Sequence, residues 1–411
     1  MYILFMDYGE EIVILFSKHY YILCTMNQKY PLLFLLVFLT TQIFADPPIP
    51  PKGFRWVVNG IFSDEFNGNK LNSKKWYDTF NGWEGRAPAM FIPEAISVKN
   101  GNLEIKSGVL DKPVNDFTIY GGAVSSKSSN AYYGYYECRA KASKIAMSTT
   151  FWMSNAKVPY ADTEDTRDSY SQELDIQECI GGGTVHKKFR NGMNSNTHFR
   201  YVKPGEKKET FMSKGTGATL NSEVSDEFHT YGAWWKNANE VMYYADNQLF
   251  DTVMVCTDIS SRPFDRPMKI NMVTETYNWQ PAPLKEDLLN DEINTAFYDW
   301  IRSYELVKVD KKMKLTYKEP IYTENIKLEV KNIDTSLLVD FTYKANRNRK
   351  IEFLFLDQDG NVLHKKKVAV YAGYGNNNLE IEMDNFKNKK PYCVQAKYTF
   401  KLKLKTVETV F

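Results

Sequence analysis

The chain has 411 residues, which is enough for two or three domains of ordinary size. Its formal net charge is only +2, so nothing in the bulk charge suggests a polyanion-binding protein, and we expect no nucleic-acid partner. Aromatic residues are abundant, with 27 Tyr, 25 Phe and 8 Trp. This content suits the core of a β-sandwich, and it also supplies flat side chains on which sugar rings stack.

An apolar run near the N-terminus predicts export. After Met26, a short charged segment precedes an apolar run over residues 31–44, and Ala45 occupies the cleavage position of a signal peptide. We therefore interpret residues 1–25 as an upstream extension, with Met26 as the start and residues 1–45 as a leader. The run is too short to span a bilayer comfortably, so we expect no stable membrane span and a secreted, cell-surface or periplasmic protein. An amphipathic N-terminal anchor is the alternative.

A Pro-rich linker, residues 46–52, precedes a long region of short alternating runs at residues 53–310. Gly, Asn, Asp and Pro punctuate these runs at close intervals, and helical periodicity is confined to residues 284–294. Many short strands separated by turns are typical of antiparallel sandwiches and jelly rolls. The sequence therefore predicts an all-β, concanavalin-like jelly roll, with Asp246-Asn247 as one hairpin turn.

The last part of the chain, residues 316–411, alternates again after a solvated Lys/Asp-rich stretch. Residues 326–330 and 351–355 are examples, and residues 357–360 form a predicted turn. We expect a second, smaller C-terminal β-sandwich. It would bind carbohydrate, or serve as a spacer or an attachment module, and the sequence leaves these roles open.

Four cysteines follow the leader: Cys138, Cys179, Cys256 and Cys393. No C-x-x-C spacing occurs, so the sequence carries no zinc signature. Cys138 and Cys179 lie in apolar strand contexts and are predicted core residues, although an exported protein could also pair them.

Three carboxylates lie within six residues, in a segment that otherwise has the pattern of a buried strand. Strand alternation puts Glu173 and Asp175 on one face, with Leu174 and Ile176 on the other. Glu178 breaks this parity, and one extra residue in a β-bulge would return it to the face of the other two acids. Burying three like charges is costly unless the chemistry needs them, and glycoside hydrolysis needs two carboxyl groups across a sugar linkage.

Two other interpretations of the acids stay open. One is a solvated acidic strand edge, which the interleaved apolar residues disfavour. The other is a metal site, although no His lies close by in sequence to complete it.

The pattern Glu173-x-Asp175-x-x-Glu178 resembles the active-site signature of glycoside hydrolase family 16 in its bulged form. The resemblance covers residues 53–306. It implies a retaining mechanism with Glu173 as nucleophile, Glu178 as acid/base and Asp175 as a modulator of both, and it needs no cofactor for catalysis. Other segments that resemble the family are its strands at residues 64–68, 133–137, 229–235 and 299–304 and a turn at residues 100–103.

Within that family, residues 83–88, 196–199 and 274–279 look most like agarases and porphyranases, which cleave red-algal galactans. The resemblance implies an endo-acting hydrolase of β-1,4 linkages in agar-type galactan, with porphyran slightly favoured over agarose. The expected partner is the polysaccharide, and we expect a monomer. A kappa-carrageenase, a laminarinase and a non-catalytic lectin-like protein are the alternatives.

Porphyran carries sulfate, so its recognition needs cationic donors, and the planar fork of Arg suits an oxyanion. Arg86 and Arg167 occupy positions that resemble those of substrate-binding arginines. The alternative for Arg86 is an ion pair with Glu84 or Glu94, and for Arg167 a salt bridge within its own loop.

Further substrate contacts are expected around the acids. The candidates are His198, to hydrogen-bond sugar hydroxyls, Glu275, and the stacking platforms Trp83, Trp152, Trp235 and Trp279. For the Trp and His residues a place in the core is the alternative. The resemblance also implies a structural Ca²⁺, with Asp299 and the carbonyl of Gly101 as oxygen ligands.

Overall fold

The computed structural model describes residues 3–8, 11–16, 46–157, 169–202, 206–258, 262–333, 335–387, 389–400 and 403–411. The chain divides into two compact units, Met1–Ile43 and Phe44–Phe411. In the first unit, β1 (Ile3–Tyr8) and β2 (Glu11–Phe16) pair in an antiparallel hairpin.

The predicted signal peptide from Met26 to residue 45 lies outside the described residues. Within the described part of the chain, no helix combines the length and the apolar character that a membrane crossing requires.

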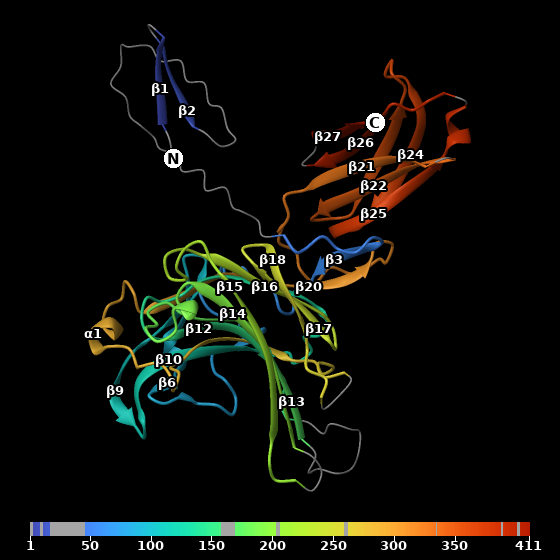
Figure 1. The fold of residues 1–411 in the computed structure, drawn as a ribbon. Coiled ribbons are helices and arrows are strands. Elements are labelled where there is room, and N and C mark those ends of the chain that lie inside the picture. Colours follow the sequence, from blue (N-terminus) through green and yellow to red (C-terminus); the bar gives the residue numbers. More distant parts are fainter. Residues whose placement is uncertain are drawn as a thin grey trace. The chain divides into compact units, whose positions relative to one another are not determined.

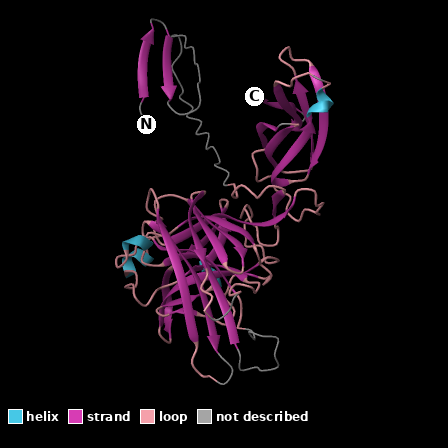
Figure 2. Ribbon diagram, turned by 45° about the vertical axis from the view of Figure 1, so that its right-hand side comes forward, coloured by secondary structure: helices cyan, strands magenta, loops and turns pink. Residues whose placement is uncertain are grey.

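The second unit is built almost entirely of strands, as Figures 1 and 2 show. One sheet carries the acid motif. In spatial order it contains β15 (Thr210–Thr219), β14 (Gly192–Val202), β13 (Ser169–Ile180), β12 (Ser148–Ser154), β19 (Lys269–Thr274), β10 (Phe117–Ser126), β6 (Ala89–Phe91) and β5 (Gly85–Arg86), and β4 (Trp76–Tyr77) and β9 (Gly108–Val114) also pair with β10.

The other sheet runs through both halves of the unit. Its order is β18 (Gln248–Met254), β17 (Glu240–Ala245), β16 (His229–Asn237), β11 (Gly134–Lys141), β20 (Thr295–Lys308), β3 (Phe54–Val58), β25 (Gly373–Glu382), β22 (Ser336–Ala345) and β21 (Asn325–Ile333). In addition, β8 (Asn102–Lys106) pairs with β20, and β7 (Ile96–Lys99) pairs with β8.

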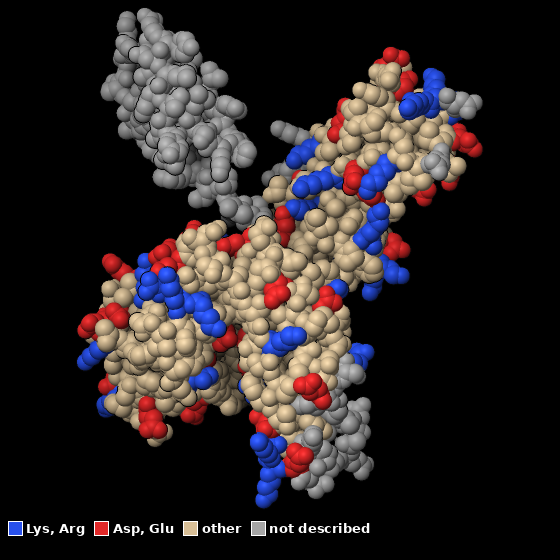
Figure 3. Space-filling model, viewed as in Figure 1, with Lys and Arg blue, Asp and Glu red and all other residues tan. Residues whose placement is uncertain are grey.

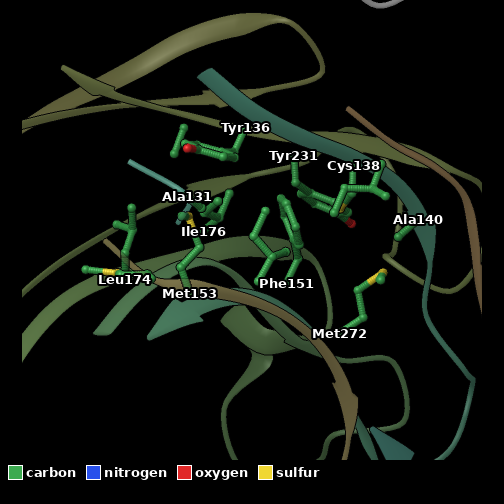
Figure 4. Close-up of a cluster of buried hydrophobic side chains, with 14 of the residues drawn as sticks. Ala131, Tyr136, Cys138, Ala140, Phe151, Met153, Leu174, Ile176, Tyr231 and Met272 are labelled. Carbon is green, nitrogen blue, oxygen red and sulfur yellow. The ribbon is translucent and has the colours of Figure 1, made fainter. Parts of the chain in front are cut away.

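The main core fills the space between these two sheets (Figure 4). Phe151 of β12 and Ile176 of β13 meet Cys138 of β11 and Tyr231 of β16 there, all essentially inaccessible to solvent. One face of β13 therefore supplies core packing and leaves its other face for polar groups. The all-β class is confirmed, and the predicted core thiols Cys138 and Cys179 are buried and free.

In the described ranges, helical structure is limited to short segments: η1 (Pro93–Ala95), η2 (Lys187–Phe189), α1 (Lys285–Leu288) and η3 (Met383–Phe386). The periodicity at residues 284–294 thus yields only a four-residue helix. The predicted hairpin turn is confirmed, because Asp246 and Asn247 connect β17 to β18 with φ values of 46° and 66°. Asp and Asn tolerate this left-handed conformation better than most residues.

The C-terminal part forms the predicted second sandwich. Its outer sheet contains β24 (Val362–Val370), β23 (Arg349–Leu356), β26 (Cys393–Phe400) and β27 (Lys403–Val410). This sheet shares a core with β21, β22 and β25, in which Leu337, Phe341, Phe353 and Val394 are buried.

On the face of the molecule drawn in Figure 3, Lys and Arg side chains and Asp and Glu side chains are interspersed among neutral surface.

An unexpected feature is the continuity of the two sandwiches. Strand β3 pairs with β20 on one side and with β25 on the other. Trp56 of β3 is fully buried in an aromatic cluster that contains Tyr304 from the first sandwich and Tyr322 and Tyr374 from the C-terminal part. The C-terminal sandwich therefore completes a shared sheet and a shared core, where the sequence suggested a module behind a solvated linker.

Gly373→Ala tests this junction. Gly373 has φ +139°, and a Cβ there would lie 2.3 Å from the carbonyl oxygen of Trp56, so we expect a loss of at least about 2 kcal/mol in the free energy of unfolding in urea. The matched control is Gly360→Ala, a turn glycine at φ +79° with no neighbouring atom within 4 Å, which should cost about 1 kcal/mol from backbone preference alone. Equal losses in the two variants would contradict the close packing of β3 against β25.

Candidate active site

The acid motif lies on β13, and the register of this strand shifts within the motif. On the β12 side, Phe151 lies opposite Gln177, and the next residue, Trp152, lies opposite Asp175. This pairing leaves Ile176 as an extra residue on β13, which is the definition of a β-bulge.

The register with β14 shows the same shift. Asn196 lies opposite Asp175 and Asn194 lies opposite Glu178, so two steps along β14 match three steps along β13. Residues directly opposite each other point to one face, and alternation puts Asn194 and Asn196 on the same face. Asp175 and Glu178 therefore share the face that also carries Glu173. The predicted bulge is confirmed.

Two features of the surrounding residues accommodate the bulge. Ile176 and Gln177 both turn away from the acids, with 0% and 2% of their surfaces exposed. The hydroxyl of Ser195 on β14 donates a hydrogen bond of 2.8 Å to the carbonyl oxygen of Ile176. A carbonyl displaced from the sheet ladder is thereby paired, which removes a large part of the cost of the extra residue.

The first two acids share contacts with His198, which lies opposite Glu173 on β14. Its Nε2 atom lies 2.9 Å from an oxygen of Asp175 and 4.0 Å from one of Glu173. Burial, together with the charge of Glu173, raises the pKa of Asp175 well above its usual value. Burial also lowers the pKa of His198. The contact with His198 therefore fixes the position of Asp175 beside Glu173.

Glu178 has a different environment. The hydroxyl of Tyr277 donates a hydrogen bond of 2.7 Å to its Oε1 atom. Burial and the nearby Asp175 raise the pKa of Glu178 to about 7, against the opposing effect of that hydrogen bond. A carboxyl group that keeps its proton near neutral pH is suited to act as a general acid.

Arg86 lies next to this end of the motif. Its Nε atom donates to Glu275 at 2.8 Å, so its partner is neither Glu84 nor Glu94. Burial raises the pKa of Glu275 to about 7, with Arg86 acting in the opposite direction. The guanidinium carbon lies 5.2 Å from the centroid of the Tyr277 ring, which links this ion pair to the partner of Glu178.

Three of the four predicted Trp platforms lie around the motif. Trp152 lies opposite Asp175, shares its face and stacks on Phe80 at 5.6 Å between ring centroids, and Trp83 packs edge-on against it at 6.3 Å. Trp279 is 38% exposed and stacks on Tyr277 at 5.0 Å. Aromatic surfaces thus flank the acids on the β12 side and beside Glu178.

The fourth, Trp235, is in the core and corrects the prediction. It is fully buried, and it packs edge-on against Tyr133 and Phe264. A side chain enclosed in this way has no face for a sugar, so Trp235 is not retained as a platform. The other predicted contact, Arg167, lies outside the described residues.

One of the two calcium ligands predicted from the resemblance, Asp299, already has a positive partner in the structure. The carboxylate of Asp299 binds the guanidinium of Arg139 at 2.5 Å, which supplies its positive partner. In the described ranges, the one group of His, Cys, Asp and Glu side chains close enough to hold an ion is Glu173, Asp175 and His198. Asp175 in this group already pairs with Nε2 of His198, and Glu173 pairs with Arg200, so we derive no step through a metal.

Two contacts of the acids were not predicted. Arg200 lies 3.2 Å from an oxygen of Glu173, and its guanidinium carbon lies 5.2 Å from the ring centroid of Phe211. That same ring stacks on His198 at 5.2 Å. The second unpredicted contact is the one between Tyr277 and Glu178. The contact of Arg200 could have been found from the alternation along β14, which puts His198 and Arg200 on the same face.

Ser195→Ala tests the support of the bulge. Loss of the hydroxyl leaves a buried carbonyl without its donor, which should cost about 1–3 kcal/mol of stability, and displacement of Glu178 should lower kcat roughly tenfold to a hundredfold. Ser336→Ala in the C-terminal sandwich is the control, because this buried serine donates to Glu380 at 2.6 Å, far along the chain from the acids. If the two variants retain the same activity, Ser195 does not support the site.

The pH dependence tests the state of Glu178. Activity that needs its proton should fall as the pH rises through about 7. In Tyr277→Phe, loss of a hydrogen bond that favours the charged form should move this basic limb of kcat/KM to higher pH. The control is Tyr392→Phe, at a half-exposed tyrosine of the C-terminal sandwich. A limb that stays in place or moves to lower pH would refute the assignment.

Comparisons with known proteins agree with this geometry. Residues 56–306 match the family model described as Beta-porphyranase A-D, GH16 domain, and residues 321–409 match the Porphyranase-associated domain. The chain is 44% identical over 261 residues to Beta-porphyranase E of Zobellia galactanivorans, covering 63% of this chain and 91% of that protein. It is 36% identical over 357 residues to Beta-porphyranase D of the same species, covering 82% and 83%.

A solved structure shows the same architecture. The crystal structure of a beta-porphyranase from the human gut bacterium Bacteroides plebeius superposes with a TM-score of 0.59 at 40% identity. The match covers 64% of this chain and 96% of that one.

Proposed function

We propose a mechanism on the premise that this chain belongs to glycoside hydrolase family 16 and, within it, to the porphyranase domain family. The protein is an O-glycosyl hydrolase of agar-type galactan, with porphyran favoured over agarose. The observation that carries the mechanism is the bulge that puts Glu173, Asp175 and Glu178 on one face of β13.

In this mechanism Glu173 attacks the anomeric carbon, and Glu178 protonates the departing glycosidic oxygen. Water then hydrolyses the glycosyl-enzyme, with Glu178 acting as the base, so the anomeric configuration is retained. The high pKa of Glu178 supports its first role. Arg200 supports the role of Glu173, because its guanidinium lies 3.2 Å from that carboxylate and fixes its position.

Arg86 is the proposed sulfate ligand. Its Nε atom donates to Glu275, and within the described residues neither of its two terminal nitrogens donates an observed hydrogen bond. These nitrogens form the planar fork that binds two oxyanion oxygens together. A sulfate ester held there would lie close to Tyr277 and to the acid/base group.

The remaining assignments follow from the sequence. We propose that residues 53–310 form the catalytic domain, that the leader directs secretion, and that the enzyme acts as a monomer. The known relatives include an extracellular agarase from Streptomyces coelicolor, 27% identical over 286 residues, which supports an extracellular location. The shared sheet supports a structural role for residues 316–411.

Substitutions of the acids test the mechanism. Glu173→Gln and Glu178→Gln should each lower kcat on porphyran by at least about 1000-fold, because each removes a group that reacts. Asp175→Asn should lose less. Reducing-end release from porphyran is the measurement, and full activity in either Glu variant would refute the mechanism.

Arg86→Ala tests the substrate. Loss of a charge-assisted contact to sulfate should lower kcat/KM on porphyran by about 10–100-fold, with a smaller loss on agarose. Arg190→Ala is the matched control, because Arg190 is exposed and paired with Glu223. Equal losses on the two polysaccharides would rule out a sulfate contact at Arg86.

A further inference from the structure

A cavity adjoins Glu178 on the side of β14 and β15, the opposite side of β13 from Trp152 on β12. Its volume is about 530 Å³, within the range of sites that bind small molecules. Lys188, Asn194, Asn196, Gly215 and Gly217 are among the residues that line it. Among the predicted substrate contacts that the structure describes, none lines it.

The floor of this cavity is set by alternation along β15. Asn194 lies opposite Gly217, and Asn196 lies opposite Gly215, so both glycines occupy the face that carries the acids. Farther along the same face, Phe211 lies opposite Arg200, beside Glu173. On this face, β15 therefore has no side chain next to Glu178, whereas it has an aromatic ring next to Glu173.

Packing within the protein explains the two glycines only in part. A Cβ at Gly215 would lie 3.1 Å from the side chain of Asn196 and from the carbonyl oxygen of Ser195, and one at Gly217 would lie 3.0 Å from the carbonyl oxygen of Met193, so an added methyl group would be crowded at both positions without a severe clash. Each glycine inside a strand costs roughly 0.5–1 kcal/mol relative to Ala. Such glycines often mark the close approach of a ligand, and a sugar ring over a bare sheet fits this explanation.

Lys188 gives the cavity its charge. It belongs to η2, in the loop between β13 and β14, and its Nζ lies 5.3 Å from the ring centroid of Phe189. No ion pair of Lys188 is found within the described residues, whereas Arg190 in the same loop binds Glu223. Lys188 is the one basic residue in the cavity lining, and its exposed side chain has no observed carboxylate partner there to compete with an incoming anion.

We propose that this cavity is a galactose-binding subsite in which Gly215 and Gly217 form the floor and Lys188 binds a sulfate ester of the sugar. The inference rests on the proposed function, since it assumes a galactan in the cleft. It adds a second cationic contact, separate from Arg86 and its partner Glu275. Substrate recognition next to the acid/base then depends on both space and charge.

Calorimetric binding to Glu173→Gln protein, which keeps Glu178 intact, tests the subsite. The probes are sulfated oligosaccharides from porphyran and neutral oligosaccharides from agarose. Lys188→Ala should weaken binding of the sulfated probe by about tenfold and leave the neutral probe unchanged. Lys187→Ala is the matched control, an exposed neighbour that is not part of the cavity lining, and should change neither.

Gly217→Val tests the floor. Its side chain should occupy the space of the sugar ring and weaken both probes by at least about tenfold, while thermal unfolding shows whether the fold is kept. Unchanged sulfated-probe affinity in Lys188→Ala, or equal losses on the two probes, would overturn the subsite whatever the glycine variant does. If the parent protein binds neither probe, the proposed function itself fails.

Discussion

One extra residue in β13 is the constraint on which the site depends. Without it, strict alternation would turn Glu178 into the core, where Ile176 and Gln177 now lie. Both neighbouring strands accept the shift, and the hydroxyl of Ser195 pairs the displaced carbonyl. Strand β13 thus loses one regular pairing position, and all three acids lie on one of its faces. Core packing by the opposite face of the strand then holds that face in position.

The second requirement is to keep three acids together at an acceptable electrostatic cost. The structure does this differently for each acid. Asp175 pairs with His198, Glu173 forms an ion pair with Arg200, and burial raises the pKa of Glu178 so that it keeps its proton. The cost remains visible in stability: with a pKa of about 7 against a usual 4.5, Glu178 binds more proton in the folded state, so its contribution declines as the pH rises through this window.

The sequence predicted the features that depend on local alternation, and missed those that depend on strand pairing. The bulge follows from the spacing of acids and apolar residues on a single strand. Arg200 becomes a neighbour of Glu173 only through the register of β14, and Asp299 is paired by Arg139 from an adjacent strand. Parity also leaves open which face of a strand is the core, which is why Trp235 was misassigned. The pairing of β3 with β25 was not predicted, because the Lys/Asp-rich stretch before residue 316 has the composition of a solvated linker.

The central claim is that the bulge presents Glu173 for direct attack with Glu178 as its acid partner. Trapping the glycosyl-enzyme with an activated 2-fluoro galactoside, followed by peptide mass spectrometry, tests this claim most directly. The account predicts one added sugar on the peptide that contains Glu173, attached at that carboxylate. A label on Glu178, or hydrolysis with inverted configuration and no labelled intermediate, would contradict it.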